Sequence, residues 1–131
     1  MADEITINLS VDVVSGNTRA SFRPLAITPD LTTLTFKDGI QNIGTTRENL
    51  SFPSDVTAGG YCWFRNVSTS TSTTYDPTIT IAACASTEAG TSFPFLQLRP
   101  SEYALVRGVS TSFSAISSTA TANLQFGALS A

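Results

Sequence analysis

The stretch FPFLQLRPSEYALVR, residues 93–107, contains two apolar runs separated by a turn. We predict a tight turn at residues 99–102 (RPSE), because proline at the second position of a turn has its φ angle already set. The run that follows, residues 103–106 (YALV), is apolar at every position. A strand of this kind is covered on both faces, so we expect a second sheet or a partner chain to cover it.

The same two-sided pattern occurs at residues 61–64 (YCWF), and alternating patterns occur elsewhere. The clearest covers residues 4–14, where isoleucine, leucine and valine alternate with polar residues. Strict period two predicts a half-buried strand there, and residues 15–17 (SGN) predict a turn. We expect a second strand over residues 20–27, with a bulge or an edge position at Pro24.

The next segment contains a signal for a second turn. Residues 38–39 (DG) are typical of a two-residue hairpin, so we expect a strand to end there and a short one to return through Ile40 and Ile43. Residues 44–60 predict a long connection, with a brief strand around residues 50–52.

The remaining segments complete an all-β pattern. Short strands are expected around residues 79–83 and 122–126, with polar loops at residues 68–74 and 85–92. Turns about ten residues apart are typical of a two-sheet sandwich or jelly roll. We therefore expect one all-β domain over residues 1–131, a β-sandwich of about eight to ten short antiparallel strands.

The composition excludes several classes of function. Charged residues are only 13% of the chain, the net charge is −3, and there is a single lysine. Nucleic-acid binding relies on clustered basic residues, so we do not expect it. The chain has no histidine, which removes the base of Ser-His-Asp and Cys-His catalysis and the usual zinc ligand. We predict no enzymatic activity, no catalytic residue, no cofactor and no metal site.

Membrane insertion and export are not expected either. No apolar run approaches the ~20 residues needed to cross a bilayer, and the acidic N-terminus lacks the features of a signal peptide. We therefore expect a protein made in the cytosol. A reducing cytosol favours free thiols for Cys62 and Cys84, and a disulfide between them on neighbouring strands is the alternative.

Candidate contact residues lie on the two-sided apolar strands. Arg65 and Arg107 each end such a strand, and arginine is enriched at protein contacts; a solvated strand end is the alternative. An aromatic residue in an apolar strand belongs to the core or to an interface. The candidate interface residues are therefore Tyr61, Trp63, Arg65, Tyr103 and Arg107.

Three blocks of sequence carry a resemblance to a known family. The first is residues 42–46 (NIGTT) with Glu48 and Leu50, the second is Gly60-Tyr61 followed by residues 64–67 (FRNV), and the third is residues 95–107 (FLQLRPSEYALVR). In this order they resemble small β-structured virion proteins of tailed double-stranded DNA bacteriophages. In that family the third block usually has Leu-x-Pro-Gly-Glu before an apolar strand. Ser101 stands at the glycine position here, and we expect a type I turn.

The resemblance implies a non-enzymatic part that is assembled onto a capsid or a tail. Our first hypothesis is a capsid decoration or cement protein of the virion, bound to the major capsid protein or to other virion proteins and itself a homodimer or homotrimer. One alternative is a carbohydrate-binding or receptor-contacting sandwich of a phage tail or fibre, with Tyr75 as a candidate glycan contact beside a polar loop. Another is the coat protein of a small icosahedral virus.

Overall fold

The computed structural model describes residues 3–4, 6–23, 30–31, 36–52, 60–69, 76–88, 94–107 and 112–129. The contacts divide the chain into two units, Met1–Leu34 and Thr35–Ala131. We expected one β-sandwich over residues 1–131, and the strands of both four-stranded sheets come from the second unit.

The first unit contains two small antiparallel pairs of strands. β1 (Asp3–Glu4) pairs with β4 (Asp30–Leu31), and β2 (Val11–Ser15) pairs with β3 (Thr18–Phe22). The predicted turn between β2 and β3 is confirmed. Gly16 has a φ angle of 56°, and a left-handed glycine at the first central position is what a type II′ hairpin turn requires.

The prediction of a half-buried strand in the first unit is wrong for β2. Every residue of β2 and β3 is exposed. Val13 and Val14 point to opposite faces of the hairpin, and their side chains are 52% and 67% exposed. Alternation in a sequence indicates a face that is suited to burial, but it does not supply the layer that covers this face.

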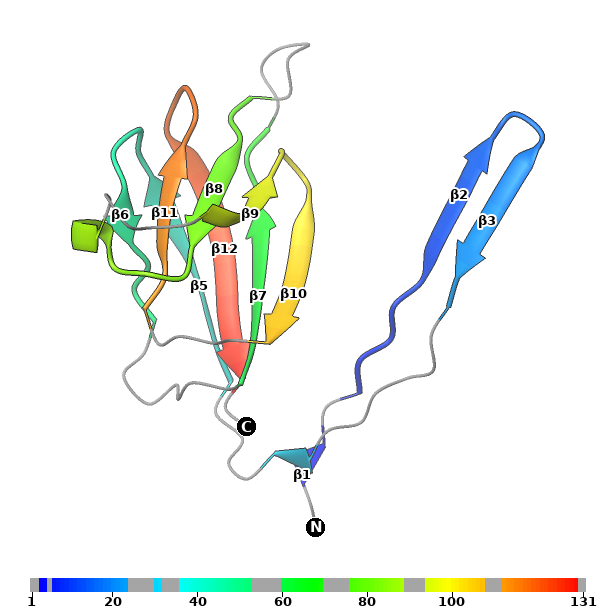
Figure 1. The fold of residues 1–131 in the computed structure, drawn as a ribbon. Coiled ribbons are helices and arrows are strands. Elements are labelled where there is room, and N and C mark those ends of the chain that lie inside the picture. The colour runs from blue at the N-terminus through cyan, green and yellow to red at the C-terminus, as the bar shows by residue number, and fades with distance from the viewer. Residues whose placement is uncertain are drawn as a thin grey trace. The chain divides into compact units, whose positions relative to one another are not determined.

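The second unit contains two four-stranded antiparallel sheets (Figure 1). The first sheet has the order β10-β7-β12-β5, and its strands are β5 (Phe36–Ile43), β7 (Tyr61–Asn66), β10 (Tyr103–Arg107) and β12 (Ala122–Leu129). The second sheet has the order β6-β11-β8-β9, and its strands are β6 (Glu48–Asn49), β8 (Ile79–Ala82), β9 (Pro94–Leu98) and β11 (Ser114–Ser117). A short 3-10 helix, η1 (Ser86–Glu88), follows β8.

The strand pairing is that of a jelly roll. The first strand of the unit pairs with the last, β5 with β12, and the nested pairs are β6 with β11, β7 with β10 and β8 with β9. This is the order that results when one long hairpin is rolled into two four-stranded sheets. The all-β, two-sheet prediction is therefore confirmed for the second unit.

The hairpin predicted at residues 38–39 is wrong. Both residues lie inside β5, which runs unbroken beside β12, with Asp38 opposite Gly127 and Gly39 opposite Phe126. A local turn preference is outweighed here by a ladder of eight residue pairs with a strand some eighty residues away. The brief strand expected around residues 50–52 is found just before them, as β6.

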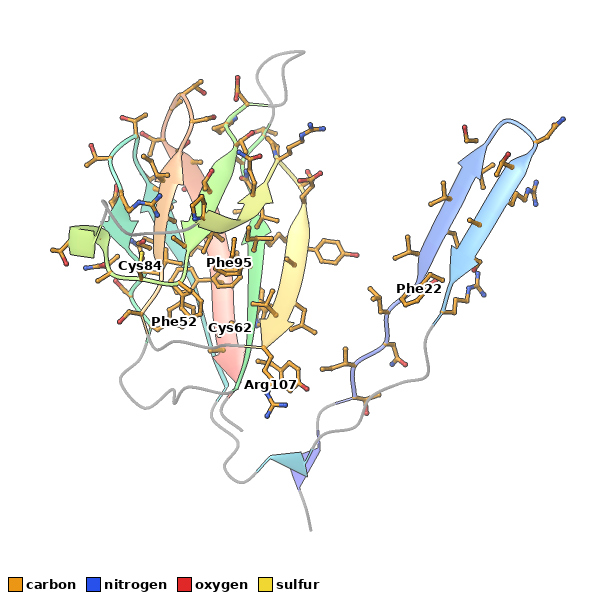
Figure 2. All side chains as sticks on the ribbon, in the orientation of Figure 1. Phe22, Phe52, Cys62, Cys84, Phe95 and Arg107 are labelled. Carbon is orange, nitrogen blue, oxygen red and sulfur yellow. The ribbon has the colours of Figure 1, made fainter. Side chains whose placement is uncertain are left out.

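The core lies between the two sheets and is built from alternate residues of each strand. In β7, Cys62 and Phe64 are buried while the residues between them face away from the core. The ring of Phe52 lies 4.8 to 6.2 Å, centroid to centroid, from the rings of Phe64, Phe113 and Phe126. Figure 2 labels Phe52 and Cys62. The buried apolar side chains are Ile43, Leu50, Cys62, Phe64, Ile79, Ile81, Ala82, Leu98, Phe113, Ala115, Ala122, Leu124, Phe126 and Ala128.

One buried polar side chain joins the two sheets. Asn66, at the end of β7, is fully buried, and its Nδ2 donates to the carbonyl oxygens of Pro77 (2.9 Å) and Leu98 (3.1 Å). Its Oδ1 accepts from the backbone N–H of Ser68 at 3.1 Å. Because both donors and the acceptor have partners, the amide adds hydrogen bonds between the sheets without leaving a buried polar group unpaired.

The turn that links β9 to β10 is where predicted, but it is not of type I. The N–H of Glu102 donates to the carbonyl of Arg99 at 3.0 Å, and Ser101 at the third position has a φ angle of 71°. A positive φ at that position defines a type II turn, which favours glycine. Ser101 N–H donates to Asn66 O, and Asn66 N–H donates to Glu102 O, so Ser101 occupies the glycine position of a G1 bulge.

Candidate functional site

The five candidate interface residues lie on one surface. Tyr61, Trp63 and Arg65 alternate along β7 with buried residues, and Tyr103 and Arg107 alternate along β10 with residues that pack on the core. Because alternate residues of a strand share a face, all five belong to the side of the first sheet that points away from the core. We call this side the outer face.

The register brings these residues together in cross-strand pairs. Tyr103 lies opposite Arg65, and Arg107 lies opposite Tyr61. The guanidinium carbon of Arg107 is 5.9 Å from the centroid of the Tyr61 ring, which is a cation–π contact at the long end of the usual range. Figure 2 shows Arg107 at the end of β10. Tyr103 is 79% exposed, so its ring is available to a partner.

The outer face also contains residues that were not among the predicted site residues. Leu105 lies between Tyr103 and Arg107 and is 45% exposed, and Ile40 on β5 is 67% exposed. Gln125 on β12 is the register partner of both Arg65 and Ile40. Leu105 was missed because residues 103–106 are apolar at every position, so the sequence does not show which of them face outward. Ile40 was missed because the 38–39 turn signal placed it on a returning strand.

Part of the outer face is hollowed into a shallow open depression. It is lined by Trp63, Arg65, Ser101, Tyr103, Ala104, Leu105 and Gln125. Two aromatic rings, a leucine, a guanidinium, an amide and the small residues Ser101 and Ala104 therefore border the same space. Such a mixture suits contact with a protein surface or with a sugar ring.

The metal-ligating and nucleophilic side chains are a separate class of candidate residue. That part contains no cluster of three or more metal-ligating side chains, and the whole chain has no histidine. Both cysteines are free, so the predicted free thiols are confirmed. Burial raises the pKa of the Cys62 thiol, which disfavours the nucleophilic thiolate. Tyr75, the candidate glycan contact, lies outside the described residues.

Comparisons with protein-family models, with curated proteins and with solved structures found no match. Among the described residues there is no helix of the length and apolar character that a membrane span requires.

Proposed function

We propose that this chain is a non-enzymatic structural protein of a tailed-bacteriophage virion, a capsid decoration or cement protein that docks on the head shell. The observation that carries the proposal is the outer face, where aromatic, aliphatic and arginine side chains gather on an ordered sheet. Tyrosine, tryptophan and arginine are the residue types enriched at protein contacts.

The fold and the sequence blocks support the same proposal. The jelly roll is a fold of viral capsid domains, although a fold alone does not define a function. The second block covers β7 except for Cys62 and Trp63, and the third block contains β10. These two strands pair with each other and supply most of the outer face. Five residues of the outer face, Tyr61, Arg65, Tyr103, Leu105 and Arg107, therefore belong to these two blocks.

The proposed mechanism is mechanical. The outer face bridges neighbouring capsomers and raises the free energy needed to separate them under the pressure of packaged DNA. The low charge of the chain means that few ions lose their hydration on docking. Each copy needs only a weak contact, because many copies on a repeated lattice reinforce one another.

Two measurements test this proposal. Mass spectrometry of purified virions should find many copies of the chain per particle, and a trace amount contradicts the decoration role. Purified chain added to shells that lack it should bind them and raise their melting temperature. The variant Tyr103→Ser/Leu105→Ser should lose shell binding. Gln97→Ala, a change at an exposed position of the second sheet, is the control and should bind as the unmodified chain does.

A second candidate is supported by the depression on the outer face. Trp63 and Tyr103 border it together with Arg65 and Gln125, and aromatic rings beside polar side chains are suited to stacking on a sugar ring. Jelly rolls also occur among lectin domains. A glycan array tests this candidate: a signal that is lost in Tyr103→Ala favours a tail or fibre protein that contacts a receptor. Closed shells formed by the purified chain alone favour a coat protein instead.

A further inference from the structure

The depression on the outer face has one charged side chain among its described lining residues, Arg65. Glu102, the residue before Tyr103, is not among these lining residues. Its carboxylate accepts a hydrogen bond from the N–H of Arg99 at 2.8 Å. The described lining is therefore positively charged, and its charge complements a ligand that carries a negative charge.

Arg65 presents its guanidinium on the surface of the first sheet. The residue is exposed, whereas its neighbours along β7, Phe64 and Asn66, are buried. Among the described residues, none forms a hydrogen bond or an ion pair with the Arg65 side chain. The N–H groups of this guanidinium are therefore open to a ligand, and a guanidinium offers five of them in a planar fork.

The register of the sheet determines which side chains surround Arg65. Tyr103 on β10 lies opposite Arg65 on one side, and Gln125 on β12 lies opposite it on the other. Trp63 shares the outer face with Arg65 and lies two residues away, which is about 7 Å along the strand. A ligand group bound at Arg65 is therefore beside a phenol and an amide, and the next part of the same ligand is within reach of the indole.

We propose that the depression binds a sugar that carries a carboxylate, a uronic or sialic acid unit of a polysaccharide. The carboxylate accepts hydrogen bonds from Arg65. The apolar face of the sugar ring packs on the rings of Trp63 and Tyr103, and the amide of Gln125 bonds to hydroxyl groups. This inference rests on the second candidate of the proposed function, the receptor-contacting sandwich, and it names the class of sugar.

The guanidinium is the group that distinguishes an acidic sugar from a neutral one. Arginine pairs with a carboxylate through two parallel hydrogen bonds, which are stronger than bonds between neutral groups. The chain as a whole has a net charge of −3, so its overall field does not attract polyanions. Binding of an acidic polysaccharide therefore requires a local contact of the kind that Arg65 offers.

The size of the depression favours a sugar over an acidic segment of a protein. A standard protein contact covers about 800 Å² of each partner, so a docked protein would need the whole outer face. The volume of the depression, about 470 Å³, is within the range of small-molecule sites, about 300–1,000 Å³. Such sites combine apolar and aromatic walls with a few polar groups, as this depression does.

The fluorescence of Trp63 measures this binding directly. It is the single tryptophan of the chain, and it borders the depression. Three carboxylated polysaccharides are titrated, polygalacturonate, hyaluronan and polysialic acid, each beside its carboxyl-reduced form, in which CH₂OH replaces the carboxylate. At least one should change the fluorescence with a dissociation constant about tenfold or more below that of its reduced form. No change with any of the three, or equal affinity for the two forms, overturns the proposal.

Three arginine variants separate the charge from the aromatic rings. Arg65→Gln should abolish the preference for the carboxylated form and leave the weaker binding of the reduced form unchanged. Arg65→Lys keeps the charge but not the paired hydrogen bonds, so it should retain only part of the preference. Arg19→Gln, the same change at an exposed position of β3, is the matched control and should bind as the unmodified chain does. A preference that survives Arg65→Gln contradicts the proposal.

Two further outcomes distinguish a failure of this inference from a failure of the proposed function. Polyglutamate that binds as tightly as the best polysaccharide overturns the sugar, because the site then recognises a carboxylate on a protein chain. Reduced polysaccharides that bind as tightly as the carboxylated ones, with the signal lost in Tyr103→Ala, overturn the acidic class but support the sugar-binding candidate. Many copies per virion without binding of any polysaccharide support the decoration role and contradict this inference alone.

Discussion

Replacing Asn66 by alanine tests the account of how the two sheets are joined. The substitution removes three hydrogen bonds, to the carbonyls of Pro77 and Leu98 and from the N–H of Ser68. The two carbonyl oxygens and the N–H of Ser68 then lose the Asn66 side chain as a partner, at a site where this side chain is fully buried. A net hydrogen bond contributes about 1 kcal/mol, and an unsatisfied buried group costs about 1–3 kcal/mol. We expect a loss of about 3 kcal/mol in the free energy of unfolding.

The single tryptophan, Trp63, lies on the same strand as Asn66 and reports unfolding by its fluorescence. Urea titration should show a lower midpoint for Asn66→Ala with an unchanged slope. Asn66→Asp keeps the shape but sets a carboxylate oxygen against two carbonyl oxygens, so it should be at least as destabilising at neutral pH. Asn123→Ala is the matched control, because Asn123 is exposed, and it should cost less than about 0.5 kcal/mol. A loss below about 1 kcal/mol for Asn66→Ala would refute the reasoning.

Three further outcomes are expected. Ser101→Gly should raise the free energy of unfolding by about 0.5–1 kcal/mol, since glycine adopts the φ angle of 71° without strain; unchanged or lower stability contradicts this. A thiol reagent should label half-buried Cys84 in the native protein and reach Cys62 only on unfolding, because burial both covers Cys62 and raises its pKa; equal labelling rates contradict this. A hydrogen bond from Ser21, the larger cause, and hydrogen bonds from Arg23 lower the pKa of Asp12. Their contribution to the stability of the β2–β3 hairpin is therefore fully present above the ordinary pKa of aspartate, and it is lost as the pH falls through the lowered pKa. NMR titration should show this low pKa, and Ser21→Ala should move it back toward the ordinary value.

The candidate residues were predicted from their types, as aromatic residues on two apolar strands and as arginines at the ends of these strands. Because both runs are apolar at every position, the sequence did not state which side chains face outward, and the structure supplies this by alternate burial along each strand and by pairing the two strands in register. What the pattern does not contain is which strands become neighbours. Gln125 and Ile40 therefore entered the site only through the pairing of β12 with β7 and β5.

The wrong predictions have the same physical origin. A DG dipeptide is a local signal, and at residues 38–39 it is overridden by pairing with a strand that is distant in the sequence. Alternation over residues 4–14 is also local, and it does not state whether a covering layer exists. The turn at residues 99–102 was found because proline acts locally, but its type depends on the bulge that Ser101 makes with Asn66 on β7.

The nested pairing has a consequence for synthesis on the ribosome. β12 is the last of the described strands to be made, and it lies between β7 and β5 in the first sheet. A nascent chain that ends before residue 122 therefore contains β5 but not β12, the strand that pairs with it. The apolar side chains of the core then stay exposed to water. Because pairing of remote segments is slow, we expect the sandwich to assemble only after β12 has left the ribosome. A chaperone that shields apolar strands during that interval should raise the yield of folded protein.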